Sequence, residues 1–375
     1  MILVLNAGSS SIKFSLFQTD LTEHLAGIAE EIGGASRLTI AGAVDTSPLP
    51  DHASALRAIL GALETRGVTL AGLTAVAHRV VHGGAHFSAP CRIDTASMAA
   101  IEIAAPLAPL HSPPIIAAIH AVTAIAPDLP QTASFDTAFH ATVPDVAARY
   151  ALPPEAEGLG LRRYGFHGTS YASLVRRLPQ ISQEPLPTRL LALHLGNGAS
   201  LCAIRDGRSV ATTMGYSPLS GLTMGTRTGD IDGNAVLRLA EEHGIDGAGH
   251  LLNRQSGLAG LGGHSDMRAL QAAGSDAARF AITHFRYWAV RHAGSMIAAM
   301  GGLDAVAFTG GIGEHDAASR AAICDGLAWI GVTLDTAANQ FDSPGLHAAG
   351  TLPVWIVPAE EERQIAQDAL AVLTP

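Results

Sequence analysis

The sequence predicts an α/β protein built from two related domains. Apolar strand patterns alternate with helical patterns along both halves of the chain, which has 375 residues and a hydrophobic fraction of 48%. Each half also opens on the same design, in which an apolar strand leads through a polar residue into a glycine-rich turn. The two copies are Asn6-Ala7-Gly8 and His194-Leu195-Gly196. This weak internal repeat favours two domains of one architecture.

The first half is expected to begin with strands and to continue with alternating helices and strands. The helix over residues 113–125 opens on prolines, which suit the first helical turn. The expected elements are a β-hairpin over residues 1–17, strands over 25–30 and 37–41, a helix over 51–66, a buried strand over 73–81, helices over 94–105 and 113–125, and a strand over 131–139.

The second half follows a proline- and glutamate-rich stretch over residues 143–160. We predict an N-terminal domain of residues 1–142 plus 363–375 and a C-terminal, nucleotide-binding domain of residues 143–362, with the last helix returning to the first domain. The elements expected in the second half are a helix starting after His167, a strand–turn–strand unit over 190–204, a long helix over 276–300, strands over 305–308 and 353–357, and a helix over 360–373.

Charge and composition exclude several function classes. The net charge of −10, without a large basic cluster, argues against nucleic acid or an anionic membrane as a main partner. Cys91, Cys202 and Cys324 fit neither a disulfide framework nor a zinc spacing, which favours a reducing cytoplasm. No apolar run approaches the length of about 18 residues that a membrane span needs, and the N-terminus lacks a secretory signal pattern. We expect a cytoplasmic protein that acts on small molecules.

Lys13 stands out because it is the one lysine among the 23 lysines and arginines of the chain. It follows a turn of small hydroxyl residues that includes Ser9 and Ser11. Backbone N–H groups and hydroxyls in such a turn suit an anion, and a compact ammonium adds a point charge that a planar guanidinium does not reproduce. We interpret the turn as a phosphate site. The alternative is that an arginine-biased composition left one lysine by chance.

Three glycine-rich turns follow apolar strands, which is typical of nucleotide-binding proteins. They lie at Gly8, at Gly196 to Gly198, and at Gly310 to Gly313. A turn without side chains lets a phosphate or a flat ring approach the backbone. Each turn alone is weak evidence, and the three together predict a nucleotide site. The chain contains neither a P-loop nor a dinucleotide-binding glycine fingerprint, so the predicted site belongs to another class.

Four polar residues occur in apolar or glycine-rich surroundings, where a charge is costly unless it meets a counter-charge. Two lie at the ends of apolar strands, and two lie in glycine-rich loops. A structural ion pair is the alternative for the strand arginine, and a structural histidine is the alternative for the loop histidine. The four are Arg79, Asp136, His167 and Arg227.

Three histidines, His78, His82 and His86, have an even spacing that could hold a metal ion. They surround the pair Gly83-Gly84, and no carboxylate or cysteine lies nearby in the sequence. Metal ligation is therefore the less favoured interpretation of this trio.

Six motifs in one order carry a resemblance to a known family. They are Asn6-Ala7-Gly8-Ser9-Ser10-Ser11, His78-Arg79-Val80-Val81-His82-Gly83-Gly84, Phe135-Asp136-Thr137-Ala138-Phe139-His140, Arg163-Tyr164-Gly165-Phe166-His167-Gly168-Thr169-Ser170, His194-Leu195-Gly196-Asn197-Gly198 and Met224-Gly225-Thr226-Arg227. With them the chain resembles the acetate kinase family, within the acetate and sugar kinase/Hsp70/actin superfamily, nearly from end to end. The resemblance implies two ribonuclease H-like (actin-like) domains with the active site in the interdomain cleft.

The resemblance also implies roles for individual residues. Asn6 and Glu361 would hold Mg²⁺, with Mn²⁺ as the alternative metal. Asp136, His167 and Arg227 would serve the reacting centre. The acyl substrate would meet Arg79, Val81, Leu110, Phe166 and Pro218. ATP or ADP would be bound by Ser9, Ser11, Lys13, His194, Leu195, Gly196, Asn197, Gly198, Asp266, Met267, Arg268, Gly311, Ile312, Gly313, Glu314 and His315. The family also implies a homodimer, with the helix over 276–300 as the candidate interface.

Two motifs depart from the family pattern. The third glycine motif usually ends Gly-Glu-Asn, and here it ends Gly313-Glu314-His315. The C-terminal acidic motif usually contains Asn-Glu-Glu-Leu, and here three glutamates precede Arg363. Glu360, Glu361 and Glu362 are therefore all candidates for the metal, and Glu361 is our choice.

The implied activity is reversible transfer of the ATP γ-phosphoryl group to acetate, by direct in-line attack, giving acetyl phosphate and ADP in organic acid metabolism and acetyl-CoA biosynthesis. A carboxylate is already ionised at pH 7, so it needs positioned cations rather than a general base. Asp136 would then orient an arginine or the metal shell.

Three alternatives remain. One is a kinase for propionate or another short-chain carboxylate. A second is a sugar kinase, in which Asp136 would be the base. A third is an actin-like or Hsp70-like ATPase, which the acyl-pocket residues disfavour. We expect Val81, two residues after Arg79, to share its face of the strand, to leave room for a methyl group and to crowd an ethyl group, so that propionate remains a slow substrate.

Overall fold

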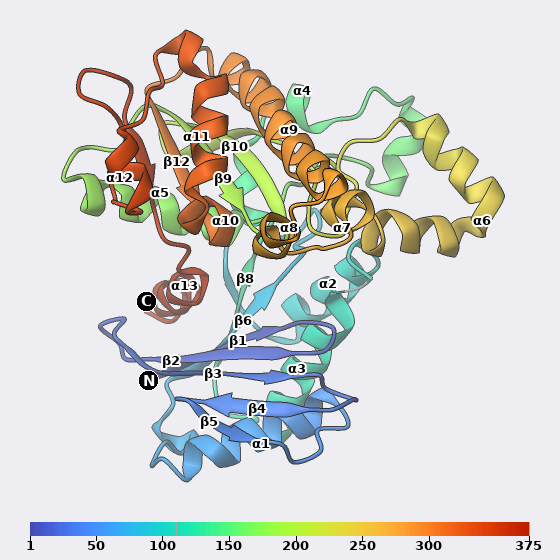
Figure 1. Ribbon diagram of the computed structural model, residues 1–375. Helices are drawn as coiled ribbons and strands as arrows, with labels where there is room; N and C mark the ends of the chain where they lie inside the picture. The colour runs from blue at the N-terminus through green and yellow to red at the C-terminus, as the bar shows by residue number, and fades with distance from the viewer. Residues whose placement is uncertain (110, 375) are drawn as a thin grey trace. The chain divides into compact units, whose positions relative to one another are not determined.

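The computed structural model describes residues 1–109 and 111–374 and has an α/β architecture with two mixed sheets. The chain divides into two compact units (Figure 1). Unit 1 comprises Met1–Phe139 and the C-terminal segment that begins at Glu360, and unit 2 comprises His140–Ala359. Glu361 thus belongs to unit 1, whereas the predicted domain limits placed it with the C-terminal domain.

The sheet of unit 1 has the strand order β5-β4-β3-β2-β1-β6-β8-β7. β1 pairs antiparallel with β2 and parallel with β6, and β6 pairs parallel with β8. The strands are β1 (Ile2–Ala7), β2 (Ile12–Phe17), β3 (Glu23–Glu30), β4 (Arg37–Ile40), β5 (Ala43–Asp45), β6 (Ala75–Val80), β7 (Cys91–Arg92) and β8 (Gln131–Phe135).

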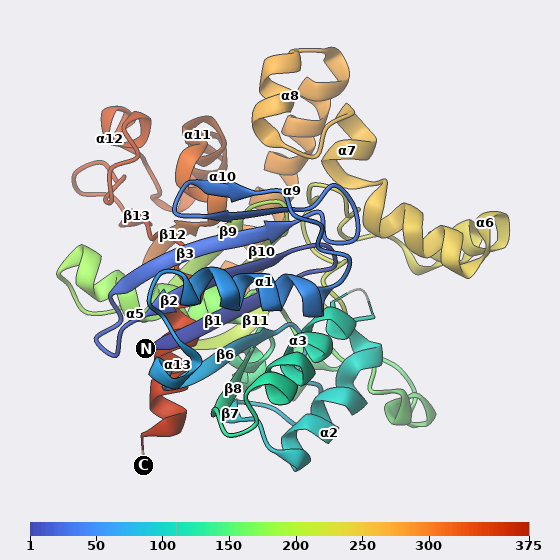
Figure 2. The same cartoon turned by 90° about the horizontal axis from the view of Figure 1, so that it is seen from below.

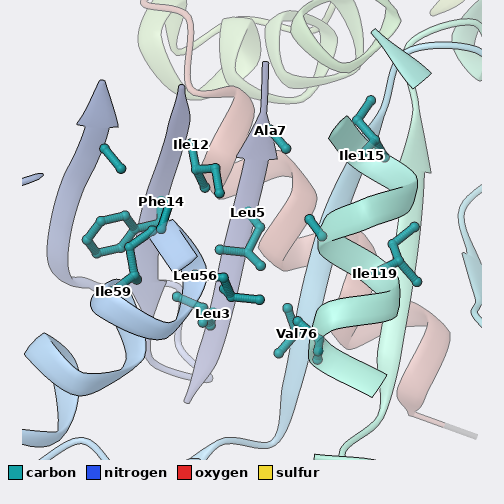
Figure 3. Packing of buried hydrophobic residues seen from close by; sticks show 14 of the residues in the cluster. Leu3, Leu5, Ala7, Ile12, Phe14, Leu56, Ile59, Val76, Ile115 and Ile119 are labelled. Atoms are coloured by element: carbon teal, nitrogen blue, oxygen red, sulfur yellow. The ribbon is translucent and has the colours of Figure 1, made fainter. Parts of the chain in front are cut away.

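Helices cover both faces of this sheet because its central strands are apolar on both sides. Leu3 and Leu5 of β1 pack with Leu56 and Ile59 of α1 and with residues of α3 in one buried cluster (Figure 3). Figure 2 shows α1 and α3 on that face. Each fully buried aliphatic side chain of this kind stabilises the fold by about 1.5–3 kcal/mol. The helices of unit 1 are α1 (His52–Glu64), α2 (Thr95–Ala104), α3 (Ser112–Ile125) and α13 (Glu361–Leu373).

The opposite face of the sheet is covered by the last helix of the chain. Ile2 and Val4 alternate with Leu3 and Leu5 along β1, so they point to the other side. There they pack with Ile365, Ala366 and Ala369 of α13. This packing brings the acidic start of α13 to the same sheet that carries Arg79.

The sheet of unit 2 repeats the core of the first. Its order is β11-β10-β9-β12-β13, with β9 antiparallel to β10 and parallel to β12, and with β12 parallel to β13. This is the pattern of β3-β2-β1-β6-β8, so the weak internal repeat of the sequence does mark two related units. The strands are β9 (Arg189–Leu195), β10 (Ala199–Arg205), β11 (Arg208–Thr212), β12 (Ala305–Thr309) and β13 (Val354–Ile356).

The longest helix of unit 2, α9, lies along β9, β10 and β11. The other helices are mostly short and connect the strands to the loops that carry the predicted site residues. The helices are α4 (Asp145–Ala148), α5 (Gly168–Ser182), α6 (Gly233–Arg254), α7 (Gly257–Gly262), α8 (Met267–Ala273), α9 (Asp276–Met300), α10 (Gly310–His315), α11 (Ala317–Gly326) and α12 (Thr336–Gln340). Short 3₁₀ turns are Leu70–Gly72, Ala105–Leu107, Ala138–Thr142, Pro154–Leu159 and Ala328–Ile330.

The expected strand over residues 131–139 is too long. β8 ends at Phe135, and a 3₁₀ turn occupies Ala138–Thr142. The backbone N–H of Asp136 still donates to the carbonyl of Val80, at 3.0 Å. Asp136 therefore lies at the carboxyl end of a parallel strand, next to the end of β6.

Candidate active site

A buried ion pair between Arg79 and Asp136 forms the centre of the candidate site in unit 1. The two residues come from neighbouring parallel strands, β6 and β8, at the ends where both strands stop. Nε of Arg79 donates to both carboxylate oxygens of Asp136 at 3.1 Å, and Nη2 donates to Oδ2 at 2.6 Å. The Asp136 side chain is only 2% exposed, so the pair is shielded from water. A bidentate contact of this kind fixes the plane of the guanidinium.

Two further oxygens approach the free edge of the same guanidinium. Oδ1 of Asn6 lies 3.4 Å from Nη1 of Arg79, and Oε2 of Glu361 lies 3.6 Å from the same nitrogen. Burial alone would lower the pKa of Arg79, but the carboxylates of Asp136 and Glu361 outweigh burial and raise that pKa well above its usual range. Burial raises the pKa of Glu361, although Arg79 opposes the shift. The arginine is therefore fixed in its charged form.

Lys13 lies beside this cluster and pairs with Glu362, with 2.8 Å between Nζ and Oε1. Lys13 is opposite Asn6 in the β1–β2 hairpin. Its side chain remains 53% exposed, so it can reach a ligand at little cost in burial. Of the three candidate glutamates, Glu362 faces Lys13, Glu361 faces Arg79, and Glu360 pairs with Arg363 at 2.7 Å.

The hydroxyl turn before Lys13 is tight and open to solvent. The N–H of Gly8 donates to the carbonyl of Ser11 at 2.7 Å, which closes the turn. Ser9 is exposed and Ser11 is partly buried. Both serines thus keep some exposure to solvent in this turn.

Val81 does not share the face of Arg79. β6 ends at Val80, so the strand alternation stops before Val81. Val81 is partly buried and packs against the cluster that α1 and α3 cover, whereas Arg79 contacts the start of α13. Leu110, the other aliphatic residue predicted for the acyl pocket from this half, lies outside the described residues.

In unit 2, His167 occupies a strained position directly before α5. Its backbone is in the left-handed region, with φ of 58°, at the N-cap of the helix. This conformation is unusual for a residue other than glycine and is a typical mark of a functional position. Nδ1 of His167 lies 2.9 Å from Oγ of Ser200, and its ring stacks on that of His194 at 4.2 Å between centroids. The Nδ1 atom of His194 in turn meets Oγ of Ser170 at 2.8 Å.

The turn around His167 depends on a glycine. Gly165 has φ of +76°, and a Cβ there would lie 2.6 Å from the ring of His140. His140 is buried and contacts the carbonyl of Phe166 through Nε2 at 2.9 Å. Phe166 is itself 2% exposed, so it supports the turn from inside the unit. A side chain at position 165 would therefore clash with His140 and Thr212 and strain the turn before His167.

Arg227 has surroundings opposite to those of Arg79. Its Nη1 donates to the carbonyl of Pro218 at 3.1 Å and lies 3.7 Å from the sulfur of Met224. Within residues 1–109 and 111–374 no carboxylate pairs with it. Burial, together with the charge of Arg254, lowers the pKa of Arg227. The structure therefore holds a partly desolvated cation without an anionic partner, a setting that suits an incoming anion.

The turn between β9 and β10 brings the predicted residues of unit 2 together. A Cβ at Gly198 would lie 3.0 Å from Nε2 of His167 and 3.7 Å from Nη1 of Arg227. A Cβ at Gly196 would lie 3.9 Å from Nε2 of His194 and 4.0 Å from the N–H nitrogen of Gly311. The bare backbone of this turn thus lies between a histidine–arginine pair and the loop after β12.

A cleft of about 520 Å³ opens beside this turn, entirely within unit 2. A Cβ added at Gly311 would meet nothing within 4 Å, so the wall of the cleft is open there. The cleft is lined by Gly196, Asn197, Ser265, Asp266, Met267, Arg268, Gln271, Gly311, Ile312, His315 and Asp316.

Four of the residues predicted to bind the nucleotide do not line this cleft. Leu195 and Gly313 are buried, and Gly198 faces His167 and Arg227. Oε1 of Glu314 accepts from the N–H groups of Gly310 and Ala359, both at 2.9 Å, so this side chain braces α10. The remaining eight predicted residues of unit 2, apart from His194, line the cleft.

Sequence reasoning missed several residues that hold the site in place. Ser170 and Ser200 orient the two stacked histidines, and Glu362 orients Lys13. Asp230 closes the loop that carries Arg227, because its Oδ1 accepts from the N–H of Gly221 at 2.7 Å. The two serines and Glu362 are at least 24 residues from the side chains they orient, so no local pattern could have found them.

The histidine trio does not form a metal centre. His78 Nε2 lies 2.8 Å from Oε1 of Gln131, and His82 Nδ1 accepts from the N–H of Gly84 at 2.9 Å. Over the described part of the chain, no group of three His, Cys, Asp or Glu side chains is arranged to hold a metal ion. A metal at Asn6 and Glu361 would therefore need further oxygens from water or substrate.

Among the described helices, none has both the length and the apolar character for a membrane crossing.

Comparisons with known proteins agree over the whole chain. The sequence model of the Acetokinase family matches residues 1–367. A curated relative named acetate kinase, from Nitrobacter hamburgensis, is 42% identical over 388 residues, covering 99% of this chain and 96% of its own. In the solved structures, a propionate kinase from Francisella tularensis matches with a TM-score of 0.94 and 35% identity, covering 98% of both chains. Acetate kinase from Porphyromonas gingivalis matches with a TM-score of 0.92 and 34% identity, covering 100% of this chain and 99% of the other. These matches confirm the predicted α/β fold with two actin-like domains.

Proposed function

Because the chain belongs to the acetokinase family, we propose that it transfers the γ-phosphoryl group of ATP to acetate, reversibly, giving acetyl phosphate and ADP. The activity is that of an ATP:acetate phosphotransferase, which the names of the curated relatives support. The single structural observation that carries the proposal is Arg227, a partly desolvated cation that lacks an anionic partner in the described chain.

Arg227 and His167 would stabilise the phosphoryl group while it moves. The transferring group carries negative charge on its equatorial oxygens, and pre-placed cations lower the barrier because they need no reorganisation. Nη1 of Arg227 and Nε2 of His167 both border Gly198, so a phosphoryl group above this glycine would meet both donors. Ser200 would fix the orientation of the His167 ring.

Arg79 would bind the acetate carboxylate through the edge of its guanidinium that Asp136 leaves open. Asp136 would hold the arginine plane rather than remove a proton, since acetate is ionised at neutral pH. This role explains why the aspartate is nearly inaccessible to water. The hydroxyls of Ser9 and Ser11 and the Lys13 ammonium would meet the phosphates, and the cleft of unit 2 would bind the nucleoside.

Activity in this family depends on a divalent metal, and we propose Mg²⁺, with Mn²⁺ as the substitute. The oxygens of Asn6 and Glu361 fit this ion, because Mg²⁺ prefers oxygen ligands and keeps several waters and substrate phosphates in its shell. Both oxygens lie near one nitrogen of Arg79, so they face a common point. Bound there, the metal would neutralise phosphate charge. Glu361 is the best placed of the three glutamates, since its carboxylate lies near the same Arg79 nitrogen as the Asn6 oxygen, whereas the other two face Lys13 and Arg363.

A propionate kinase is the second candidate, since one of the structural matches carries that name. Discrimination between acids that differ by one methylene amounts to only about 10–200-fold. We propose that acetate is the preferred substrate and that Val81, which packs against the cluster under α1 and α3 rather than on the face of Arg79, limits the space for the acyl chain indirectly through that packing. Replacement Val81→Ala is expected to shift the preference toward propionate.

A hydroxamate assay with ATP, Mg²⁺ and a series of acids tests the proposal. Acetate should give the highest kcat/KM, with propionate slower and butyrate slowest. Butyrate as the best substrate would make a longer-chain carboxylate kinase the better assignment. If no acid is phosphorylated, the same enzyme should be tested with sugars, for which Asp136 would serve as the base.

We further propose that the protein is a cytoplasmic homodimer that acts in organic acid metabolism and acetyl-CoA biosynthesis. α9 is the candidate interface, because Phe280 and Tyr287 are exposed on it at 58% and 63%. Light scattering on the purified protein should give twice the chain mass of 38.6 kDa. If a Tyr287→Glu variant stays dimeric, the dimer interface does not include this part of α9.

A further inference from the structure

One arginine in unit 2 is completely buried and takes no part in the proposed chemistry. Arg320 of α11 has an exposed fraction of 0%, and it is among the largest fully buried side chains of the described chain. Burial of a guanidinium is costly unless each of its N–H groups finds an acceptor. Its presence therefore calls for a function in the structure around it.

All five N–H groups of Arg320 have acceptors, and they divide into two sets. On one side, Nη1 donates to the carbonyls of Gly313 and Glu314 at 3.0 and 2.7 Å. On the other side, Nε donates to Oδ1 of Asn339 at 2.8 Å, and Nη2 donates to the Asn339 carbonyl at 2.8 Å and to Asp342. The guanidinium thus bridges α10 and the segment around α12.

The first set of acceptors belongs to the last turn of α10. The final carbonyls of a helix have no partner within the helix, and an outside donor must satisfy them. α10 has only 6 residues, fewer than two turns, so it has little stability of its own. Its other end is fixed by Glu314, whose Oε1 accepts from the N–H of Gly310. Arg320 and Glu314 together clamp the segment at both ends.

The opposite surface of the clamped segment is the wall of the cleft. Gly311, Ile312 and His315 line the cleft, and Gly311 presents bare backbone to it. Asp342 joins the two sides, because its Oδ2 lies 3.8 Å from Nδ1 of His315 while its Oδ1 contacts Arg320. A change at Arg320 would therefore move this wall without touching anything bound in the cleft.

We propose that Arg320 is a positioning residue for the nucleotide: it holds the backbone of Gly310–His315 in the shape that binds the nucleoside part of ATP and ADP. This inference rests on the proposed function, which assigns the cleft to the nucleotide. A lysine has three donors on a flexible stem and cannot bridge two helices with a planar fork, so charge alone does not satisfy the role.

The variant Arg320→Lys tests the role, with Arg189→Lys as the matched control. Arg189 also bridges a carbonyl and a carboxylate, those of Gly301 and Asp304, but it lies at the start of β9, at the far end from the Gly196 turn. Calorimetric titration with MgADP in the absence of acetate measures binding without catalysis. We expect Arg320→Lys to weaken MgADP binding and to raise the KM for ATP by at least about tenfold, because two or more charge-assisted hydrogen bonds are lost. The KM for acetate should change less than about twofold, and Arg189→Lys should bind like wild type.

The outcomes separate the inference from the proposed function. A folded Arg320→Lys variant with wild-type MgADP affinity overturns the inference. So does an equal rise in the KM values of ATP and acetate, since that marks a general loss of structure. Should Arg320→Lys fail to fold, Asp342→Asn replaces it, because Asp342 is 39% exposed and its variant keeps the arginine. A severalfold weaker MgADP binding is then expected, and unchanged binding overturns the inference. Wild-type protein that does not bind MgADP contradicts the proposed function itself.

Discussion

The two arginines of the candidate site lie in opposite electrostatic settings. Arg79 in unit 1 is bound by Asp136 and approached by Asn6 and Glu361. Arg227 in unit 2 donates to a carbonyl and a thioether sulfur and has no carboxylate partner among the described residues, and burial lowers its pKa. The charge of the first arginine is balanced by neighbouring carboxylates, which also hold its side chain in place. The charge of the second arginine has no carboxylate partner in the part of the chain that the structure describes. The difference fits the proposal that the two residues bind different groups of the substrates.

The surroundings of each arginine fit its proposed partner. The cluster of unit 1 contains the carboxylates Asp136, Glu361 and Glu362 against the cations Arg79 and Lys13. This slight excess of acid suits a metal ion beside a singly charged acetate. Around Arg227 stand His167 and the bare Gly198 turn, which suit the more highly charged phosphoryl group.

Loss of either arginine should have the largest effect on catalysis. Arg227→Ala and Arg79→Ala are each expected to lower kcat/KM by about 10²–10⁴, since a charge that faces the transition state is removed. The two should differ in substrate dependence, with the KM for acetate rising mainly in Arg79→Ala. Steady-state kinetics on purified, folded variants checks this. Near-normal activity in either would break the assignment of that arginine.

Asp136→Asn should have an intermediate effect, about 10–10² in kcat/KM, because Arg79 keeps its position but loses its charged partner. The dependence of kcat on pH should keep its wild-type form, since Asp136 moves no proton. A pH profile that loses one limb in the variant would instead identify Asp136 as a general base and favour the sugar kinase alternative.

Lys13→Arg should reduce the efficiency of ATP use severalfold, although it keeps the charge and can still pair with Glu362. The reason is that the proposed phosphate site needs a compact donor, which a planar guanidinium does not replace. Glu362→Gln is the matched control, because it frees Lys13 without altering it. Amine-selective modification gives a second test, since Lys13 is the one lysine of the chain. Full activity after modification of Lys13 would show that this residue does not bind the phosphates.

His78 should affect stability and leave activity unchanged. Burial lowers the pKa of His78 to about 4, against an ordinary value of 6.5. As the pH falls from 6.5 toward 4, His78 is protonated in the unfolded chain but stays neutral in the folded one. The free energy of unfolding therefore falls by up to about 3 kcal/mol over that range. In His78→Gln this pH dependence should be shallower in urea titrations. If the free energy of unfolding of His78→Gln depends on pH as in the wild type, groups other than His78 cause the loss of stability in acid.

The sequence predicted the parts of the molecule whose apolar patterns are strong. The hairpin of β1 and β2, the helices α1, α3 and α9, and the repeated turn at Asn6 and His194 all follow from such patterns. α6 was missed because it is polar and kinked at Gly244, with only Ala248 and Leu252 buried. β5 and β11 were missed because they are short and lie at sheet edges.

For the site, the residue types were predictable and their partners were not. Arg79 and Arg227 both drew attention as charges in apolar or glycine-rich surroundings. Only the fold shows that the end of β8 brings Asp136 to Arg79 and that no carboxylate reaches Arg227 within the described residues. The assignment of Val81 to the face of Arg79 failed as geometry because β6 ends one residue too early.

Urea unfolding of Arg79→Ala and Arg227→Ala tests the central contrast most directly. Arg79→Ala leaves Asp136 and Glu361 without their cation, so the free energy of unfolding should fall by about 3–5 kcal/mol. Arg227→Ala removes a charge that has no counter-charge, so the free energy of unfolding should stay at the wild-type value or rise. A large loss of stability in Arg227→Ala, equal to that in Arg79→Ala, would contradict the claim that carboxylates balance the charge of Arg79 and that no carboxylate of the described residues balances the charge of Arg227.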